Sequence, residues 1–268
     1  MNFKHIEGIE FDRSVLILGD LHGVWRKVNS LVAKHRPTTV LQVGDFGWWP
    51  KLHKTTKIKT GVWRRNLLDA LAPKLQAPWN QYGLKLRYSK LYFCPGNHED
   101  WVSLDEMATS WDPKAVEVMD NVFFMPRCST MELPDGRRVL FMGGASSIDK
   151  SERTPYYDWF PQEIISLEDV DALPDTKIDI VVSHACPREF RDQMNEGSND
   201  WRLRDSWWIE KFRDPSCDYL SRVLYKYEPK LWFFGHYHLA MSDVYNGCRW
   251  FCLNKQSSPG WWTFIPRK

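Results

Sequence analysis

The sequence predicts an α/β fold with mixed sheets, and three observations carry this prediction. Short apolar runs rich in Val, Ile, Leu and Phe recur along the chain and end at small or turn-forming residues, which is typical of buried strands. Helical segments separate the first of these runs, as they do in parallel sheets, whereas hairpin signals join the later ones. The 268 residues contain no repeat and no Gly/Ser linker, so we expect one domain over residues 1–268.

The first half is predicted to alternate strands and helices around one long insertion. Its elements are a strand ending at Leu18, a helix over Val24 to His35, a strand over Thr39 to Val43, a strand from Leu91 and a helix over Leu104 to Ser110. The insertion spans about residues 48–89 and is basic and aromatic. Within it, a helix is expected near Val62 to Leu71.

The second half is predicted to be richer in strands. They are expected over Asn121–Met125, Thr130–Leu133, Arg137–Met142, Ile178–Ser183, Leu231–Phe234, Ser242–Tyr245, Cys248–Leu253 and Trp261–Ile265. Asn246 and Gly247 predict a tight hairpin turn. Ser166 and Asp169 resemble a capping box that opens a short helix, and another helix is expected over Arg213 to Tyr227.

Composition narrows the class of protein. The formal net charge of +2 favours no partner by itself, and the six cysteines lack metal-finger spacing, which favours reduced thiols. The start of the chain does not resemble a signal peptide, and no apolar stretch approaches the roughly 18 residues needed to span a bilayer. We therefore expect a cytoplasmic protein with no membrane partner.

Five apolar runs deliver metal-ligand residue types where each strand ends, in the sequences GDLHG, GDFG, GNHED, SH and GHYH. Functional groups gather beyond the carboxyl ends of strands, so these candidates are expected to converge: Asp20, His22, Asp45, Asn97, His184, His236 and His238. This set is too large for one ion and suits two ions that share a bridging carboxylate. Oxygen and imidazole donors without sulfur fit two divalent ions, Mn²⁺ first, with Fe, Zn²⁺ or Ni²⁺ as alternatives. Two ions about 3.5–4 Å apart can deprotonate a water between them and stabilise both oxygens of a phosphoryl transfer.

In this order, the five sequences resemble the signatures of the calcineurin-like metallophosphoesterase superfamily. The resemblance spans Gly19 to His238 and implies a four-layer αββα sandwich of two mixed β-sheets, with the metals at one rim. It implies that Asp20, His22 and His238 hold one ion, that Asn97, His184 and His236 hold the other, and that Asp45 bridges them. It also implies attack by a metal-bridging hydroxide, with His98 as the general acid that protonates the leaving oxygen. Glu99 and Asp100 both remain candidates for orienting His98.

The second signature separates the branches of this superfamily. Protein phosphatases carry GDxVDRG, whereas Trp48 and Trp49 stand here in place of the second Asp and the Arg. The sequence is more similar to the phosphodiesterase branch, which includes RNA lariat-debranching enzymes, although those enzymes carry Cys where this chain has Asp20. We therefore expect a phosphodiesterase. The alternatives are a phosphomonoesterase on phosphoproteins or small molecules, and a nucleic-acid-binding protein with a structural metal site.

Two stretches are candidates for contacting the substrate. In GGASSIDKSER, from Gly143 to Arg153, the glycines allow close backbone approach and the two serines offer donors. Asn97, Lys150 and Arg153 are the predicted substrate-binding residues; the alternative is a solvated loop over packed aromatic residues. The insertion carries six cations among tryptophans: Lys51, Lys54, Lys57, Lys59, Arg64 and Arg65, with Trp48, Trp49 and Trp63. That pattern suits a single-stranded nucleic acid or a nucleotide, or else a solvated face. Residues 201–208 form a second basic and aromatic stretch.

Overall fold

The computed structural model describes residues 3, 6, 8–49, 84–108, 114–197 and 213–268, and it contains two six-stranded sheets. The first sheet runs β12 (Trp262–Pro266), β1 (Phe11–Leu18), β2 (Thr39–Gln42), β3 (Lys90–Phe93), β5 (Val122–Phe124) and β4 (Val116–Met119). The second runs β10 (Met241–Tyr245), β11 (Cys248–Cys252), β9 (Leu231–Phe234), β8 (Ile180–Ser183), β7 (Arg138–Met142) and β6 (Thr130–Glu132). Each sheet has four parallel strands at its centre and one antiparallel strand at either edge.

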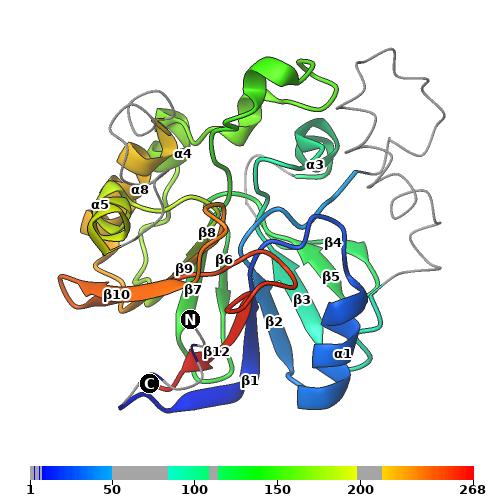
Figure 1. Cartoon of the computed structure of the whole chain (residues 1–268), viewed down its shortest axis with the longest axis vertical. Helices are drawn as coiled ribbons and strands as arrows, with labels where there is room; N and C mark the ends of the chain where they lie inside the picture. Colours follow the sequence, from blue (N-terminus) through cyan, green and yellow to red (C-terminus); the bar gives the residue numbers. More distant parts are fainter. Residues whose placement is uncertain (1–2, 4–5, 7, 50–83, 109–113, 198–212) are drawn as a thin grey trace.

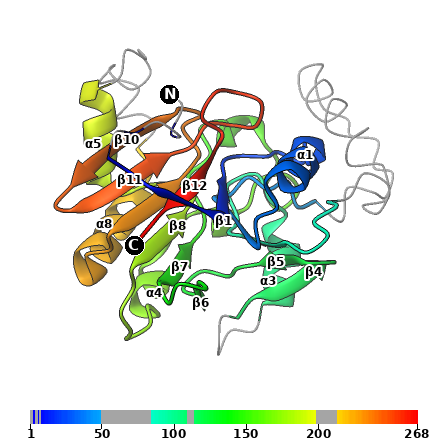
Figure 2. The ribbon, with the colours of Figure 1, turned by 90° about the horizontal axis from the view of Figure 1, so that it is seen from below.

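Helices cover the outer faces of the two sheets (Figure 1). The described helices are α1 (Arg26–His35), α3 (Trp101–Met107), α4 (Leu167–Asp171), α5 (Arg188–Gly197), α8 (Ser216–Tyr227) and the 3₁₀ turns η3 (Lys150–Glu152) and η4 (Pro161–Glu163). Seen from below, α5 and α8 flank the second sheet while α1 lies beyond the first (Figure 2). This arrangement confirms the predicted α/β sandwich of two mixed sheets.

Alternating side chains build three separate layers of core, because neighbouring residues of a strand face opposite sides of its sheet. In β1, Ile17 packs into the core between the sheets, whereas Leu16 and Leu18 pack toward α1. In β9, Phe233 faces the same central core and Trp232 packs against α5 and α8. Strands buried on both faces need apolar residues at every position, which is why the sequence reads as unbroken apolar runs.

Two local predictions are confirmed at the level of individual hydrogen bonds. At the start of α4, the Ser166 side chain accepts from the Asp169 amide, and the Asp169 side chain accepts from the Ser166 amide. Between β10 and β11, Asn246 and Gly247 have φ of 46° and 78°, as the tight hairpin turn requires.

Three elements differ from the prediction. The helix predicted over Leu104 to Ser110 is α3, which begins at Trp101 because the Asp100 side chain caps it by accepting from the Ser103 amide, and which ends at Met107. Helix α5 was not predicted, since only Phe190 and Met194 are buried among its polar residues. Strand β4 was missed because it is a half-exposed edge strand of only four residues.

Some predictions lie outside the described residues. These are the helix near residues 62–71, most of the basic insertion, and the second basic stretch at 201–208. All six cysteines fall within the described part, and all are buried and free of disulfides. Within the same part, no helix has both the length and the apolar character needed to cross a membrane. The single domain over residues 1–268 stays a prediction.

Candidate metal centre

The predicted ligands come from loops that follow five parallel strands. Asp20 and His22 follow β1, Asp45 follows β2, Asn97 and His98 follow β3, His184 follows β8, and His236 and His238 follow β9. Parallel strands present their carboxyl ends at one edge of a sheet. The two sheets meet at this edge, since His184 Nε2 lies 3.3 Å from Asp45 Oδ1 and His238 Nε2 lies 3.2 Å from Asp20 Oδ2.

We define the outer cluster as Asp20, His22, Asp45 and His238, whose ligand atoms all lie within 4.8 Å of one another. His22 Nε2 is 3.5 Å from Asp45 Oδ2 and 3.3 Å from His238 Nε2. The two carboxylates are buried, whereas the side chains of His22 and His238 are 27% and 34% exposed. The cluster is therefore anionic at its base and open to solvent through its imidazoles.

We define the inner cluster as Asp45, Asn97, His184 and His236. Asn97 Oδ1 lies 3.0 Å from His184 Nε2 and 3.1 Å from His236 Nδ1. His184 and Asn97 are buried, and His236 is half-buried. The amide oxygen of Asn97 thus lies between the two imidazoles, and His184 Nε2 also faces Asp45 Oδ1.

Asp45 belongs to both clusters and divides its two oxygens between them. Its Oδ2 faces His22, and its Oδ1 faces His184 and also accepts from the His98 amide at 2.8 Å. The residue has a φ of 52°, a left-handed conformation uncommon outside glycine, which is typical of a functional site.

The arrangement of donors and acceptors fits a cation. His184 Nδ1 donates to the Val43 carbonyl at 2.9 Å, so a neutral ring presents a lone pair at Nε2. That lone pair faces two oxygens, those of Asp45 and Asn97, and such an arrangement is favourable only when positive charge lies between them. Among the described residues no Lys or Arg pairs with Asp20 or Asp45, so this charge comes either from a proton on His184 or from a bound cation, and the donor types at the two clusters fit metal ions.

Two glycines of the signatures are needed for this close approach. A Cβ on Gly96 would lie 2.2 Å from Asp45 Oδ1, and one on Gly235 would lie 2.0 Å from Asp20 Oδ1. Any larger residue at either position would therefore push a ligand carboxylate out of place.

The charges of the site are strongly coupled. Burial alone would raise the pKa of Asp45, but His184, His98 and His22 hold that pKa well below its usual range. Burial alone would lower the pKa of His184, but the negative charge of Asp45 outweighs it and raises the pKa to about 10. Burial lowers the pKa values of His22 and His236, which favours the neutral imidazoles that bind metals. A proton on His184 thus takes the place of the positive charge that an ion would supply.

Two buried polar side chains, Gln42 and Glu99, hold these loops in place, and only Glu99 was considered from the sequence, as a partner of His98. The Gln42 side chain donates to the carbonyls of Gly19 and Gly44 and accepts from the Gly44 amide, so it joins the first two signature loops. Glu99 accepts from the amides of Gly47 at 2.8 Å and Gly96 at 2.6 Å. Gln42 could have been noticed as a large polar residue that ends a buried four-residue strand.

The partners of His98 differ from both carboxylates considered in the sequence. Glu99 is engaged by backbone amides and Asp100 caps α3, so neither orients the imidazole. Instead, Arg153 Nη2 lies 2.8 Å and 2.7 Å from the two ring nitrogens of His98. The His98 ring also meets the His22 ring edge to face, with centroids 5.2 Å apart. Burial and the Arg153 charge lower the pKa of His98 well below its usual value.

The three predicted substrate-binding residues lie in different settings. Arg153 is beside His98, donates to the Asn97 carbonyl at 3.1 Å, and forms an ion pair with Asp149 at 2.8 Å. Lys150 Nζ lies 4.2 Å above the centroid of the Trp159 ring. The Asn97 amide is engaged on both sides, because its nitrogen donates to Ser147 Oγ at 3.1 Å. Their contact with substrate stays a prediction.

The stretch from Gly143 to Ser147 uses its small residues for internal packing. A Cβ on Gly144 would lie 2.3 Å from the Glu163 carbonyl, and one on Gly143 would lie 2.5 Å from Pro95. The amides of Ser146 and Ser147 donate to Asp214 and Glu163. The two serine amides and the Ser147 hydroxyl are therefore bonded within the protein.

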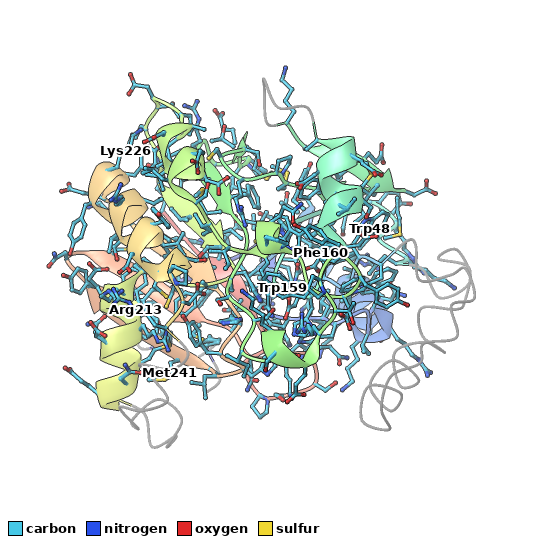
Figure 3. The ribbon with its side chains drawn as sticks, turned by 90° about the horizontal axis from the view of Figure 1, so that it is seen from above. Trp48, Trp159, Phe160, Arg213, Lys226 and Met241 are labelled. Carbon is cyan, nitrogen blue, oxygen red and sulfur yellow. The ribbon has the colours of Figure 1, made fainter. Side chains whose placement is uncertain are left out.

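Trp48 and Trp49 are core residues, which corrects the expectation that they offer a stacking surface. Their exposures are only 7% and 8%. Trp48 packs in the outer core of the first sheet, and Trp49 packs with Trp101 and Phe160. Figure 3 shows Trp48 and Phe160 among the crowded side chains at the carboxyl edge of the sheets.

Comparison with known proteins gives a family and distant structural likenesses. The model of a family described as calcineurin-like phosphoesterase matches residues 13–240. The fold is similar to phosphopantetheinyl hydrolase (PptH) from Mycobacterium tuberculosis, at 14% identity and a TM-score of 0.45, over 94% of this chain and 95% of that one. It is also similar to GAP50, the anchor in the inner membrane complex of Plasmodium, at 10% identity and a TM-score of 0.37, over 89% and 70% of the two chains. No curated protein sequence matches.

Proposed function

Because this chain belongs to the calcineurin-like phosphoesterase family and is thus a metal-dependent hydrolase of phosphoesters, we propose that it is a two-metal phosphodiesterase. Its proposed substrate is a phosphodiester of a nucleic acid or a nucleotide. The observation that carries this proposal is the pair of ligand clusters that share Asp45, with His98 beside them.

The outer cluster would hold one divalent ion and the inner cluster the other. When bound, such ions activate water as a nucleophile and polarise the oxygens of a phosphoryl group. The mixture of carboxylate, amide and imidazole donors favours Mn²⁺, with Fe, Zn²⁺ or Ni²⁺ as alternatives. The role of Asp45 is to place one oxygen in each cluster and so fix their separation.

His98 is the proposed general acid. Its ring lies next to the outer cluster and is held by Arg153, so its position is defined before a substrate binds. Burial and Arg153 keep the free imidazole neutral. A bound phosphate would attract Arg153 and stabilise the imidazolium, so the proton is available at the ring when the leaving oxygen needs it.

The charge near His98 favours a diester over a monoester. Arg153 is the cation in contact with His98, and its ion pair with Asp149 offsets its charge. A phosphodiester carries one negative charge and needs less compensation than the dianion of a monoester. Trp48 and Trp49, both buried, stand where phosphatases of this family carry an Asp and a phosphate-clamping Arg.

The nucleic-acid part of the proposal rests on the sequence of the insertion. Its six cations from Lys51 to Arg65 follow directly after Asp45, with no acidic residue among them. Lys and Arg side chains near a backbone of phosphates bind by releasing counterions, which makes affinity depend on salt. A phosphomonoesterase, or a binding protein with a structural metal site, is the alternative.

A matched pair of chromogenic substrates tests the reaction. We expect bis(p-nitrophenyl) phosphate to be hydrolysed with a higher kcat/KM than p-nitrophenyl phosphate, and activity to vanish after chelation of the metals. The Asp45→Asn variant, purified identically, controls for contaminating phosphatases. A preference for the monoester would overturn the phosphodiesterase proposal.

A salt series on oligonucleotides tests the substrate class. The logarithm of apparent affinity should fall against the logarithm of salt with a slope of about −0.7 for each phosphate contacted on a single strand. Replacing Lys51, Lys54, Lys57 and Lys59 by Gln should flatten that slope and leave the small diester unaffected. An unchanged slope would show that the insertion does not contact nucleic acid.

A further inference from the structure

A chain of three polar side chains leads from the inner cluster to a buried carboxylate. Asn97 Nδ2 donates to Ser147 Oγ at 3.1 Å, and Ser147 Oγ donates to Glu163 Oε2 at 2.8 Å. Glu163 is fully buried, and its other oxygen accepts from the Ser147 amide at 2.7 Å and from Trp159 Nε1 at 2.9 Å. Trp159 lies near the centre of the view from above, over the edge where the two sheets meet (Figure 3).

The direction of each hydrogen bond in this chain is dictated by Glu163. Above pH 7, where the carboxylate of Glu163 is mostly ionised, it only accepts, so the single hydroxyl hydrogen of Ser147 must point toward it. Ser147 Oγ can then only accept from Asn97, which requires the amide nitrogen on that side. The amide oxygen of Asn97 is consequently turned toward His184 and His236.

We propose that Glu163 is a positioning residue that, through Ser147, fixes the Asn97 amide with its oxygen toward the inner cluster. The inference rests on the proposed function, in which Asn97 is a metal ligand. An amide can rotate to exchange its oxygen and nitrogen, and only the oxygen can bind a cation. Carboxylate and backbone ligands need no such device, whereas an asparagine ligand does.

The surroundings of Glu163 suit this role better than a purely structural one. Burying a carboxylate without a cationic partner is unfavourable, and no Lys or Arg in the described part of the chain forms an ion pair with Glu163. An apolar residue or a glutamine would fill the same space without that cost. Neither replacement has two oxygens that can both accept hydrogen bonds, as Glu163 does from Ser147 and Trp159.

Glu163→Gln is the sharpest variant because it changes the direction of the chain and little else. The glutamine oxygen can still accept from Trp159 and the Ser147 amide, but its nitrogen must donate to Ser147 Oγ. The hydroxyl hydrogen is then free to point at Asn97, which favours the rotated amide with its nitrogen toward the metals. We expect Mn²⁺ affinity at one of two sites to fall by about 10–100-fold, the range typical of partners behind metal ligands.

Three further variants isolate the path through Ser147. Ser147→Ala removes the connection, so the double variant with Glu163→Gln should bind Mn²⁺ as Ser147→Ala does alone. Asp214→Asn is the matched control: Asp214 is also buried and accepts from the neighbouring Ser146 amide at 3.0 Å, but it makes no contact with Asn97. It should leave both affinities unchanged. Asn97→Ala should weaken the same site as Glu163→Gln.

Calorimetric titration of the metal-stripped full chain with Mn²⁺ alone at pH 8, where Glu163 is mostly ionised, gives the readout. A selective loss in Glu163→Gln that disappears in the Ser147→Ala background supports the proposal. The positioning role of Glu163 would be overturned if all variants lost Mn²⁺ affinity equally and additively, or if Glu163→Gln lost none. In either case, a loss of affinity in Asn97→Ala would still show that the asparagine is a ligand. If Asn97→Ala binds two ions normally, the assignment of the inner cluster itself fails, and with it the proposed function.

Discussion

The outer and inner clusters share Asp45 but differ in charge and in exposure. The outer cluster has two carboxylates and two imidazoles that reach solvent, whereas the inner cluster has a single carboxylate and a buried histidine and asparagine. The inner cluster also has a dedicated set of supporting contacts, from Val43 to His184 and from Glu163 through Ser147 to Asn97. We therefore expect the outer cluster to contact water and substrate and the inner cluster to bind its ion more tightly.

Removing the residue common to both clusters should have the largest effect. Asp45→Asn replaces the oxygen of one cluster with a nitrogen that cannot bind metal and removes the negative charge that both clusters share, so we expect both ions to be weakened together. Metal ions contribute several kcal/mol of transition-state stabilisation. At 1.36 kcal/mol per tenfold change, that corresponds to a loss of roughly 10⁴-fold in kcat/KM. Metal analysis and diester hydrolysis measure the two effects, and the loss of only one ion would show that Asp45 does not bridge.

Replacing His98, which lies beside the outer cluster but belongs to neither cluster, should reduce activity by less. His98→Ala should lower kcat for a diester with a poor leaving group by about 10²–10⁴-fold, because the departing oxygen is no longer protonated. Metal content should stay at the wild-type value. A leaving group that is stable as an anion, such as nitrophenolate, needs no proton. For such a substrate the decrease in kcat should be much smaller. Equal losses for both leaving groups would assign His98 a structural role.

Glu163, which supports the inner cluster, should make the free energy of unfolding depend on pH. Burial raises the pKa of Glu163 to about 7, from 4.5 in an exposed chain. Because the folded pKa is the higher one, the associated stability is fully present below about pH 4.5 and is lost as the pH rises through 7. Glutamine does not titrate, so metal-free Glu163→Gln should gain roughly 2 kcal/mol over wild type between pH 5 and pH 8, at 1.36 kcal/mol per pKa unit. Urea unfolding at both pH values measures this; a constant difference would contradict the buried carboxylate.

This gain in stability would accompany a loss in metal affinity in the same variant. A residue retained only for packing would not produce opposite signs in the two measurements.

The smallest expected effect is a difference between the two clusters in the rate of metal release. The imidazoles of His22 and His238 are partly exposed, so a chelator can reach the outer ion more easily than the buried inner ion. We expect two phases of metal release, with rates that differ by at least about tenfold, a barrier difference of roughly 1.4 kcal/mol. His238→Ala should accelerate or remove the fast phase only. A single phase would indicate that the difference in exposure has no consequence for exchange.

That the candidate ligands lie close together was predictable from the sequence, whereas the side chains that support them were not. Asp20, Asp45 and His184 each follow an apolar run, so the strand pattern and the residue type together indicate both their place and their chemistry. Parallel strands end at one edge of a sheet, and this rule alone predicts that the three side chains converge. Strands that are buried on both faces appear in the sequence as continuous apolar runs, and these runs predicted the central strands of both sheets.

Glu163 carries no such signal, and Gln42 carries only a weak one, as a polar residue at the end of a buried strand. Glu163 lies in a short 3₁₀ turn between irregular segments, and its bond to Ser147 depends on tertiary packing. The same limit explains Trp48 and Trp49, whose aromatic rings are equally consistent with a stacking surface and with a core. Helix α5 was missed for a related reason, since two apolar residues in ten give too weak a periodicity.

If two ions share the carboxylate of Asp45, electron paramagnetic resonance of the protein titrated with Mn²⁺ will detect them as a coupled pair. Two Mn²⁺ ions joined through one carboxylate are magnetically coupled, so the six-line signal of isolated Mn²⁺ should be replaced by a coupled spectrum as the second equivalent binds. The account predicts two ions per chain with this coupling, and its loss in Asp45→Asn. Binding of a single ion, or of two ions that keep the isolated signal, would contradict it.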